Sequence, residues 1–143
     1  MCILGRVARQ VRASAGGVYD IGYHVVWCPK YRRPVLAGSV RLRCDELIRE
    51  KAAAHDWQIV ALQIVPDHVR LLVRTHPADS PSYVANQFKG FTSRVLRGEF
   101  PQLRTRLPTL WSRSFFVASV GAVSEQTVQR YIETQYERPW RKP

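Results

Sequence analysis

A chain of 143 residues with 45% hydrophobic side chains is long enough to form one domain with a buried core. Lys and Arg outnumber Asp and Glu by 22 to 11, and the net charge of +11 favours a nucleic acid as the partner. No stretch approaches the roughly 18 apolar residues of a membrane span, and the N-terminus does not resemble a signal peptide, so we expect a soluble cytoplasmic protein that binds no membrane.

Three cysteines occur in the chain, at Cys2, Cys28 and Cys44. Their number is odd and no pair has CxxC spacing, which argues against a disulfide framework and against a zinc knuckle. We expect reduced thiols that are mostly buried.

The beginning of the chain divides into two parts. Residues 1–17 are basic and have no sustained apolar period, which predicts a mobile arm ahead of a single domain over residues 18–143. From residue 18 to 28, aromatic and β-branched residues alternate with smaller and polar ones. This pattern predicts a strand, with His24 and Val26 on the same face.

A basic loop with an aromatic residue follows this strand, with the sequence Lys30-Tyr31-Arg32-Arg33-Pro34. Its cationic side chains could bind phosphate groups while Tyr31 stacks on a base. An ordinary solvated loop is the alternative, and the sequence alone does not decide between the two.

The middle of the chain predicts a helix and a pair of strands. Ser39 is a candidate N-cap for a helix that runs to about His55. Residues 57–65 then alternate strictly, which predicts a strand with its odd-numbered and even-numbered residues on opposite faces. Pro66-Asp67 forms a tight turn into the stretch 68–74, so these two strands should pair antiparallel.

The stretch from His68 to Arg74 separates its side chains onto two faces with a period of two. Val69, Leu71 and Val73 share one face. The other face carries His68, Arg70, Leu72 and Arg74. A histidine and an arginine should therefore lie side by side.

The last third of the chain predicts a helix, a strand and a second helix. Ser82 is a candidate cap for a helix over 83–100, whose apolar residues are spaced by three and four. Residues 110–120 predict a strand, and Ser124 caps a last helix to about residue 137.

These elements follow the order strand, helix, strand, strand, helix, strand, helix. That order predicts an α+β fold: an antiparallel four-stranded sheet, ferredoxin-like or RRM-like, with helices on one face and an extra C-terminal helix that carries a tyrosine. An RNA-recognition module is a rival for this architecture, but paired sheet-surface aromatics in an RNP-type segment are not found.

Residue types and spacing alone leave the chemistry open. Tyr131 and Gln135 are four residues apart on the last predicted helix, so their side chains should meet. A tyrosine on an amphipathic helix usually belongs to a core or an interface, and one strand histidine without a second ligand makes a weak metal site. Taken alone, these features predict a basic α+β domain that binds nucleic acid.

Five blocks of the sequence carry a more specific signal. They are Tyr23-His24-Val25-Val26-Trp27-Cys28-Pro29-Lys30-Tyr31-Arg32-Arg33, Pro66-Asp67-His68-Val69-Arg70-Leu71-Leu72-Val73, Lys89-Gly90, Trp111-Ser112 and Tyr131-Ile132-Glu133-Thr134-Gln135. In order and spacing these blocks closely resemble the single-strand insertion-sequence transposases. These enzymes belong to the HUH class, named for a histidine-hydrophobic-histidine motif, and use one catalytic tyrosine. The resemblance runs from about residue 18 to residue 135.

The resemblance implies a function and a site. It implies that a bacterial or archaeal homodimer, with active sites shared between subunits, cleaves and rejoins single-stranded DNA at hairpins through a 5′-phosphotyrosine. By position, Tyr131 is the nucleophile, and His68 and Gln135 are ligands of Mg²⁺ or Mn²⁺. The candidate DNA contacts are Lys30, Tyr31, Arg32, Arg33, Lys89 and Arg94.

Arg70 departs from the family pattern, because it stands where the second histidine belongs. A guanidinium has five donors, no free lone pair and a charge that does not titrate, so it cannot ligate a metal. Two unit positive charges about 4 Å apart repel by roughly 4 kcal/mol at an effective dielectric near 20. We therefore expect weakened metal binding at this site.

Three interpretations of Arg70 are open. It abolishes cleavage and leaves a domesticated hairpin-binding relic, it is a natural or engineered change in an otherwise active scaffold, or it clamps the phosphate bidentately in partial place of the metal. We favour reduced metal-dependent activity with DNA binding kept. A replication or mobilisation nuclease of the same HUH class is a weaker alternative.

Overall fold

The computed structural model describes residues 12–14, 17–19, 22–119 and 131–133. Its elements in chain order are β1 (Arg12–Ser14), β2 (Gly17–Tyr19), β3 (Gly22–Trp27), the 3₁₀ turn η1 (Lys30–Arg32), α1 (Gly38–Ala54), β4 (Gln58–Val65), β5 (His68–Arg74), α2 (Pro81–Glu99), α3 (Gln102–Thr105) and β6 (Phe116–Ser119). Residues 131–133 are helical. No helix among these described residues is long and apolar enough to cross a membrane.

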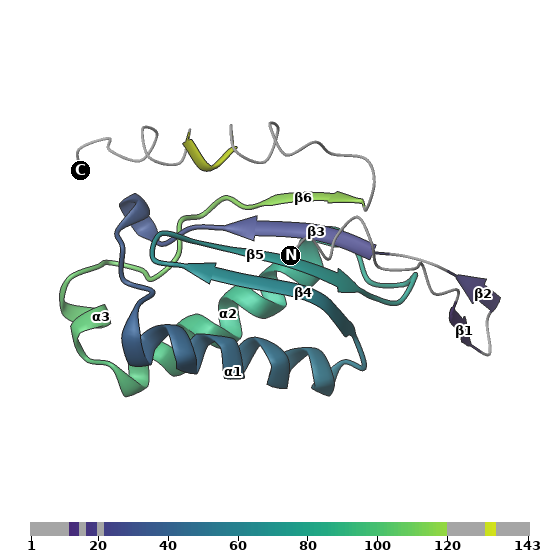
Figure 1. The fold of residues 1–143 in the computed structure, drawn as a ribbon, viewed down its shortest axis with the longest axis horizontal. Helices are drawn as coiled ribbons and strands as arrows, with labels where there is room; N and C mark the ends of the chain where they lie inside the picture. The colour runs from purple at the N-terminus through teal and green to yellow at the C-terminus, as the bar shows by residue number, and fades with distance from the viewer. Residues whose placement is uncertain (1–11, 15–16, 20–21, 120–130, 134–143) are drawn as a thin grey trace.

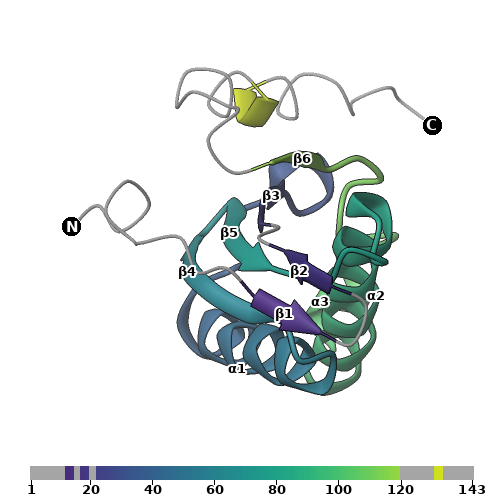
Figure 2. The same ribbon diagram turned by 90° about the vertical axis from the view of Figure 1, so that its right-hand side faces the viewer.

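The main sheet has four strands in the order β4-β5-β3-β6, and every neighbouring pair is antiparallel. The connections β3-α1-β4 and β5-α2-β6 form the split βαβ arrangement that the element order predicts. Both long helices lie on one face of the sheet, while residues 131–133 lie beyond β6 and β3, away from α1 (Figures 1 and 2). The predicted α+β, ferredoxin-like architecture is confirmed.

The start of the chain contains more regular structure than the sequence predicts. A short antiparallel ladder pairs β1 with β2, where a mobile arm up to residue 17 was expected. Residues 1–11, the rest of the predicted arm, lie outside the described residues. The predicted strand over 18–28 corresponds to β2 and β3.

The hydrophobic core fills the space between the sheet and α1 and α2. From the sheet it takes Val25 and Trp27 of β3, together with the three valine and leucine side chains that alternate along β5: Val69, Leu71 and Val73. The period of two predicted for both strands is therefore confirmed. It leaves His24, Val26, His68 and Arg70 on the opposite face, where the functional side chains are expected.

Strand β4 contradicts the predicted strict alternation. Its pairing with β5 shifts between Ile59 and Ala61, where a β-bulge inserts one extra residue. Before the bulge the odd-numbered side chains face the core, and after it the even-numbered ones do. Ile59 therefore packs on the main core together with Leu62 and Ile64. A sequence pattern of period two cannot reveal an extra residue of this kind.

The predicted caps of α1 and α2 differ from the observed ones. Helix α1 begins at Gly38 after Ala37, with no side-chain cap, so Ser39 lies inside the helix. In α2 the cap is Ser80, whose Oγ accepts a hydrogen bond of 3.1 Å from the Tyr83 backbone N–H. Pro81 occupies the first helical turn, a position that proline's fixed φ favours, so the cap precedes it instead of being Ser82.

The end of the sheet is shorter than the sequence predicts. Within the predicted strand over 110–120, only β6 pairs along β3, and Trp111 forms an isolated bridge with Pro29. Residues 112–115 between them form a loop. Of the predicted last helix over 124–137, residues 131–133 are described, and Ser124 lies outside the described residues.

Three aromatic side chains pack together at the centre of the core. Phe88 of α2 is fully buried, and its ring stacks at 6.1 Å and 16° on Trp27 and packs at 5.5 Å against Trp57. We expect Phe88→Ala to lower the free energy of unfolding by about 3–5 kcal/mol, because it leaves a cavity beside the Trp27 and Trp57 rings. Urea unfolding followed by circular dichroism measures this. Leu42→Ala, at a position 57% exposed, is the control and should change stability by less than about 0.5 kcal/mol.

Candidate active site

The candidate site lies on the sheet face opposite to α1 and α2. One row of cross-strand partners crosses all four strands there: Gln63 of β4 pairs with Arg70, Arg70 with Val26, and Val26 with Phe116 of β6. Adjacent strands are about 4.8 Å apart, so Arg70 and Phe116 are separated by roughly 10 Å. His68 lies on the same face as Arg70, one pleat nearer the β4–β5 turn.

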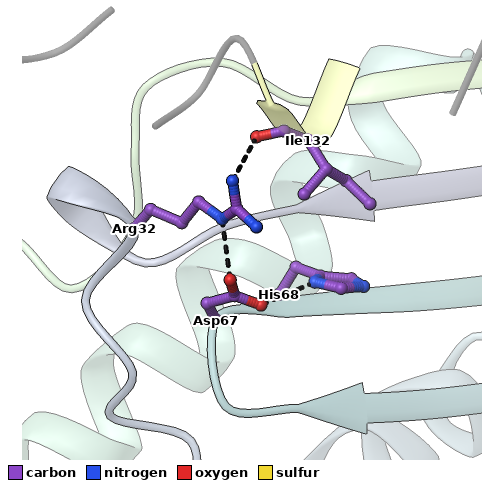
Figure 3. Close-up of polar contacts among 4 residues, drawn as sticks. All are labelled: Arg32, Asp67, His68 and Ile132. Atoms are coloured by element: carbon purple, nitrogen blue, oxygen red, sulfur yellow. Dashed lines mark hydrogen bonds and ion pairs between the residues drawn. The ribbon is translucent and has the colours of Figure 1, made fainter. Parts of the chain in front are cut away.

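The turn before β5 supplies the partner of His68. Asp67 is the second residue of the two-residue connection between Val65 and His68. Its Oδ1 lies 2.8 Å from His68 Nδ1, as Figure 3 shows. With Nδ1 engaged by the carboxylate, Nε2 is the ring nitrogen left for a ligand, which is the usual arrangement behind a ligating histidine.

Burial and charge set the protonation states of this pair. Burial lowers the pKa of His68 below its usual value, although the hydrogen bond and charge of Asp67 act in the opposite direction. For Asp67, burial alone would raise the pKa, but hydrogen bonds from His68 and Arg32 outweigh it and lower the pKa. At neutral pH the pair is therefore a neutral imidazole beside a carboxylate.

Arg32 joins this pair to residues 131–133, which we call the tyrosine segment. Its Nε donates to Asp67 Oδ2 at 2.7 Å, and its Nη1 donates to the backbone carbonyl of Ile132 at 3.3 Å (Figure 3). The turn that presents it is unusual, because Tyr31 and Arg32 both have positive φ, +59° and +52°. Each left-handed residue costs about 1–2 kcal/mol, so the surrounding contacts must hold the turn.

Tyr131 is fixed at its ring and at its hydroxyl. The ring lies 5.6 Å from the ring of Phe116 on β6, and the hydroxyl shares a hydrogen bond of 3.2 Å with Ser114 Oγ. Beside it, the Ile132 side chain is 2% exposed and packs on Val26 of β3. These contacts seat the segment over β3 and β6, next to the part of the face that carries Arg70.

Lys89, a predicted DNA contact, binds a loop of the protein itself. Its side chain is buried, and Nζ donates to the backbone carbonyls of Ser112, Arg113 and Ser114 at 2.8, 3.0 and 3.2 Å. Burial lowers the pKa of Lys89 to about 8, which still leaves an ammonium at neutral pH. Lys89 therefore shapes the loop that holds Ser114 against Tyr131.

The other predicted DNA contacts fall in different places. Lys30 and Tyr31 belong to the turn beside Asp67, and the Lys30 ammonium lies 5.5 Å from the centre of the Tyr31 ring. Arg33 follows them and is exposed. Arg94 is exposed on α2 with its guanidinium over Phe91, and thus belongs to the helical layer on the other side of the sheet from His68. Lys30, Tyr31 and Arg33 are thus neighbours of Arg32, the residue that contacts Asp67. Arg94 lies apart from them.

The described residues contain only part of the predicted divalent-cation site. They contain no group of three His, Cys, Asp or Glu side chains that could hold a metal. His68 offers one nitrogen, both Asp67 oxygens accept hydrogen bonds, and Arg70 has no lone pair to give. Gln135, the predicted third ligand, lies outside the described residues.

Two contributors to the site have little or no signal in the sequence. Asp67 was predicted only as a turn residue, although its place directly before a strand histidine could have suggested a carboxylate that orients the imidazole. Ser114 lies in the irregular loop 112–115 and belongs to no recognisable motif. Its contact with Tyr131 depends on the path that Lys89 imposes on that loop, which only the structure shows.

The class of protein follows from comparison with known sequences. Residues 17–135 match the family model described as Transposase IS200 like. This match covers most of the chain, and the protein belongs to this family of DNA transposases of insertion sequences. The family resemblance of the five sequence blocks is thereby confirmed.

Individual relatives agree with this assignment. The chain is 30% identical over 131 residues to the ISDra2 transposase TnpA of Deinococcus radiodurans, covering 90% of this chain and 94% of that protein. It is 29% identical over 121 residues to the transposase for insertion sequence element IS200 of Salmonella typhimurium, with coverages of 83% and 79%.

Two solved structures share the fold. A crystal structure of a transposase from Deinococcus radiodurans superposes with a TM-score of 0.77 at 32% identity, covering 87% of this chain and 98% of that one. A REP-associated tyrosine transposase bound to a REP hairpin superposes with a TM-score of 0.53 at 12% identity, with coverages of 94% and 72%. The second likeness concerns the fold alone.

The loop contacts of Lys89 lead to a prediction. We expect Lys89→Met to lower the free energy of unfolding by about 1–3 kcal/mol, because three carbonyl oxygens lose their shared donor. Amide hydrogen exchange in residues 112–115 should increase with it. Lys51→Met makes the same change at a half-exposed ammonium that lies 5.1 Å from the Phe91 ring, and should cost less than about 1 kcal/mol. Equal losses in the two variants would contradict this role for Lys89.

Proposed function

We propose that this transposase cleaves and rejoins single-stranded DNA at hairpin ends through Tyr131, and that Arg70 impairs the metal-dependent part of the reaction. The observation that carries the proposal is the position of the tyrosine segment. Tyr131 packs on Phe116 and Ile132 on Val26, in the same row of the sheet as Arg70. A phosphodiester bound over this row could contact β5 and the tyrosine hydroxyl together.

The proposed reaction is a reversible exchange of phosphodiester bonds. The Tyr131 oxygen attacks the scissile phosphorus, the bond to the 3′ oxygen breaks, and the phenolic proton is released as the leaving strand ends in a free 3′-OH. The product is a 5′-phosphotyrosine, and attack by a 3′-OH restores both the DNA and the phenol. The hydrogen bond with Ser114 and the contact with Phe116 fix the hydroxyl before substrate binds.

A folded single strand is the substrate that we favour. The net charge of +11 suits a polyanion, and the turn at Lys30, Tyr31 and Arg33 places cationic and aromatic groups beside Asp67. The REP-associated tyrosine transposase that shares this fold is bound to a REP hairpin. We therefore propose a DNA hairpin as the first ligand to test.

Arg70 sets the expected limit on activity. Mg²⁺ or Mn²⁺ would polarise the scissile phosphate in the family, with His68 and Gln135 as the ligands that this chain retains in sequence. The fixed charge of Arg70 opposes such an ion, while the same charge attracts a phosphate. We propose weak metal-dependent cleavage with hairpin binding kept. A catalytically inactive, domesticated hairpin-binding protein is the alternative.

The proposed assembly is a homodimer whose active sites are shared between subunits. In such a dimer the tyrosine segment of one subunit would leave its place over its own β3 and β6 and serve the His68 site of the other. Sedimentation of the protein with and without a hairpin oligonucleotide tests this assembly, and a monomer in both conditions would contradict it.

Removal of the nucleophile gives a direct test. We expect Tyr131→Phe to abolish the covalent protein–DNA adduct on a single-stranded hairpin substrate, because the attacking oxygen is gone while the ring that packs on Phe116 stays. Hairpin affinity should remain within a few-fold of the unmodified protein. Denaturing gel electrophoresis detects the adduct. An adduct that persists in this variant refutes the assignment of Tyr131.

Restoration of the histidine tests the role of Arg70. We expect Arg70→His to increase Mg²⁺-dependent hairpin cleavage by at least tenfold, because it replaces a fixed cation by a metal ligand on the same strand face as His68. Cleavage rates are compared at several Mg²⁺ concentrations, with Arg70→Gln as the control that removes the charge without adding an imidazole. Robust, equal cleavage before and after Arg70→His would show that Arg70 does not limit the enzyme.

A further inference from the structure

We infer that Arg32 is a positioning residue that couples the orientation of His68 to the seating of the tyrosine-bearing segment. The inference rests on the proposed function, in which Tyr131 is the nucleophile. It assigns to Arg32 a task different from the phosphate contact that the sequence predicts. The reasons are the geometry of its two hydrogen bonds and the backbone that presents it.

The two acceptors of Arg32 belong to opposite sides of the candidate site. Asp67 Oδ2, at 2.7 Å from Nε, is part of the carboxylate whose other oxygen engages His68 Nδ1. The carbonyl of Ile132, at 3.3 Å from Nη1, is one residue from Tyr131. Arg32 thus contacts both the histidine turn and the tyrosine segment, as Figure 3 shows.

A guanidinium is suited to this bridge. Its donors lie in a rigid plane, so fixing one bond to Asp67 restricts where the other nitrogens can point. The Arg32 side chain is 19% exposed and that of Asp67 is 28% exposed, so the ion pair is partly shielded from water. A lysine at this position could satisfy one acceptor at a time, because its ammonium is a single point charge on a flexible chain.

The local backbone supports a role beyond surface charge. Both Tyr31 and Arg32 adopt left-handed conformations, which non-glycine residues seldom do in succession. Hydrogen bonds from the Arg32 and Arg33 amides to the carbonyls of Pro29 and Lys30 close this turn. The strained turn directs Arg32 to Asp67 while Arg33, the next residue, is exposed. An arginine meant only for solvent or DNA would not require this conformation.

Arg32 therefore connects His68, through Asp67, with Tyr131, through Ile132. At one end, Asp67 keeps His68 turned so that Nε2 remains for a ligand. At the other end, the Ile132 side chain is held by Val26 and its carbonyl by Arg32, so the adjacent Tyr131 is fixed relative to β5. Loss of the guanidinium should therefore loosen the tyrosine segment and remove the Arg32 hydrogen bond from Asp67, while the contact between Asp67 and His68 stays.

A double-mutant cycle between Arg32 and Asp67 tests the coupling. The measurement is amide hydrogen exchange in the peptide that spans residues 131–133, in the full chain without DNA. We expect Arg32→Ala to accelerate exchange there by about tenfold, as expected for the loss of a charge-assisted hydrogen bond. Asp67→Asn, which alters the other acceptor of Arg32, should accelerate exchange several-fold in the presence of Arg32 and not further in its absence.

A matched control separates this effect from general loss of an ion pair. Arg49 donates to Asp45 at 2.8 Å on the exposed side of α1, and Arg49→Ala should leave exchange at residues 131–133 unchanged. Arg32→Lys should restore only part of the protection. Circular dichroism confirms that each variant is folded, and should Arg32→Ala be unfolded, Arg32→Lys and Asp67→Asn still complete the test.

Catalysis provides the second readout. Arg32→Ala should slow formation of the covalent adduct by at least tenfold, while hairpin affinity, which a lost phosphate contact would reduce, stays within about twofold. Unchanged exchange at residues 131–133 in Arg32→Ala, or additive effects of the two substitutions, would overturn the inference. Persistence of the adduct in Tyr131→Phe would instead refute the proposed function, and the exchange cycle would still report on the coupling.

Discussion

The placement of β5 between β4 and β3 is the constraint on which the site depends. Antiparallel pairing on both sides fixes its register, and the two-residue turn at Pro66-Asp67 fixes where it starts. Because side chains alternate, burying Val69, Leu71 and Val73 against α1 and α2 necessarily turns His68 and Arg70 to the other face. A slip of one residue would bury the polar side chains of His68 and Arg70, so the hydrophobic core enforces the geometry of the functional face.

The tyrosine segment is attached to this frame far more weakly than the helices are. One buried isoleucine contributes about 1.5–3 kcal/mol, and the hydrogen bonds at Ser114 and Arg32 add about 1 kcal/mol or a little more each. By contrast, α1 and α2 contribute nine buried apolar side chains to a continuous core. Among the described residues, the packing of Ile132 and the hydrogen bonds at Ser114 and Arg32 therefore decide where Tyr131 lies.

Sequence reasoning succeeds where one physical pattern dominates. The alternation of β3 and β5, the order of the main elements and the amphipathic face of α2 are local and repetitive, and the structure bears them out. It fails where a single position decides the outcome. The bulge in β4, the N-cap at Ser80 and the loop that Lys89 shapes each depend on one residue or on a contact distant in sequence. Arg32 illustrates the difference, because its charge predicts a DNA contact, while its positive φ and its hydrogen bonds to Asp67 and Ile132 are seen only in the structure.

The conflict at Arg70 is sharper in the structure than in the sequence. The parts that would orient a ligating histidine are present, since Asp67 engages Nδ1 and Arg32 supports Asp67. Arg70 adds its charge to the burial that lowers the pKa of His68, and so favours a neutral imidazole with an available lone pair. The same field opposes a divalent cation and attracts a phosphate oxygen. The chain thus retains the residues that would orient His68 as a metal ligand, while position 70 carries a charge suited to DNA. Whether this face of the sheet favours a divalent cation or a DNA phosphate therefore depends on the Arg70 guanidinium.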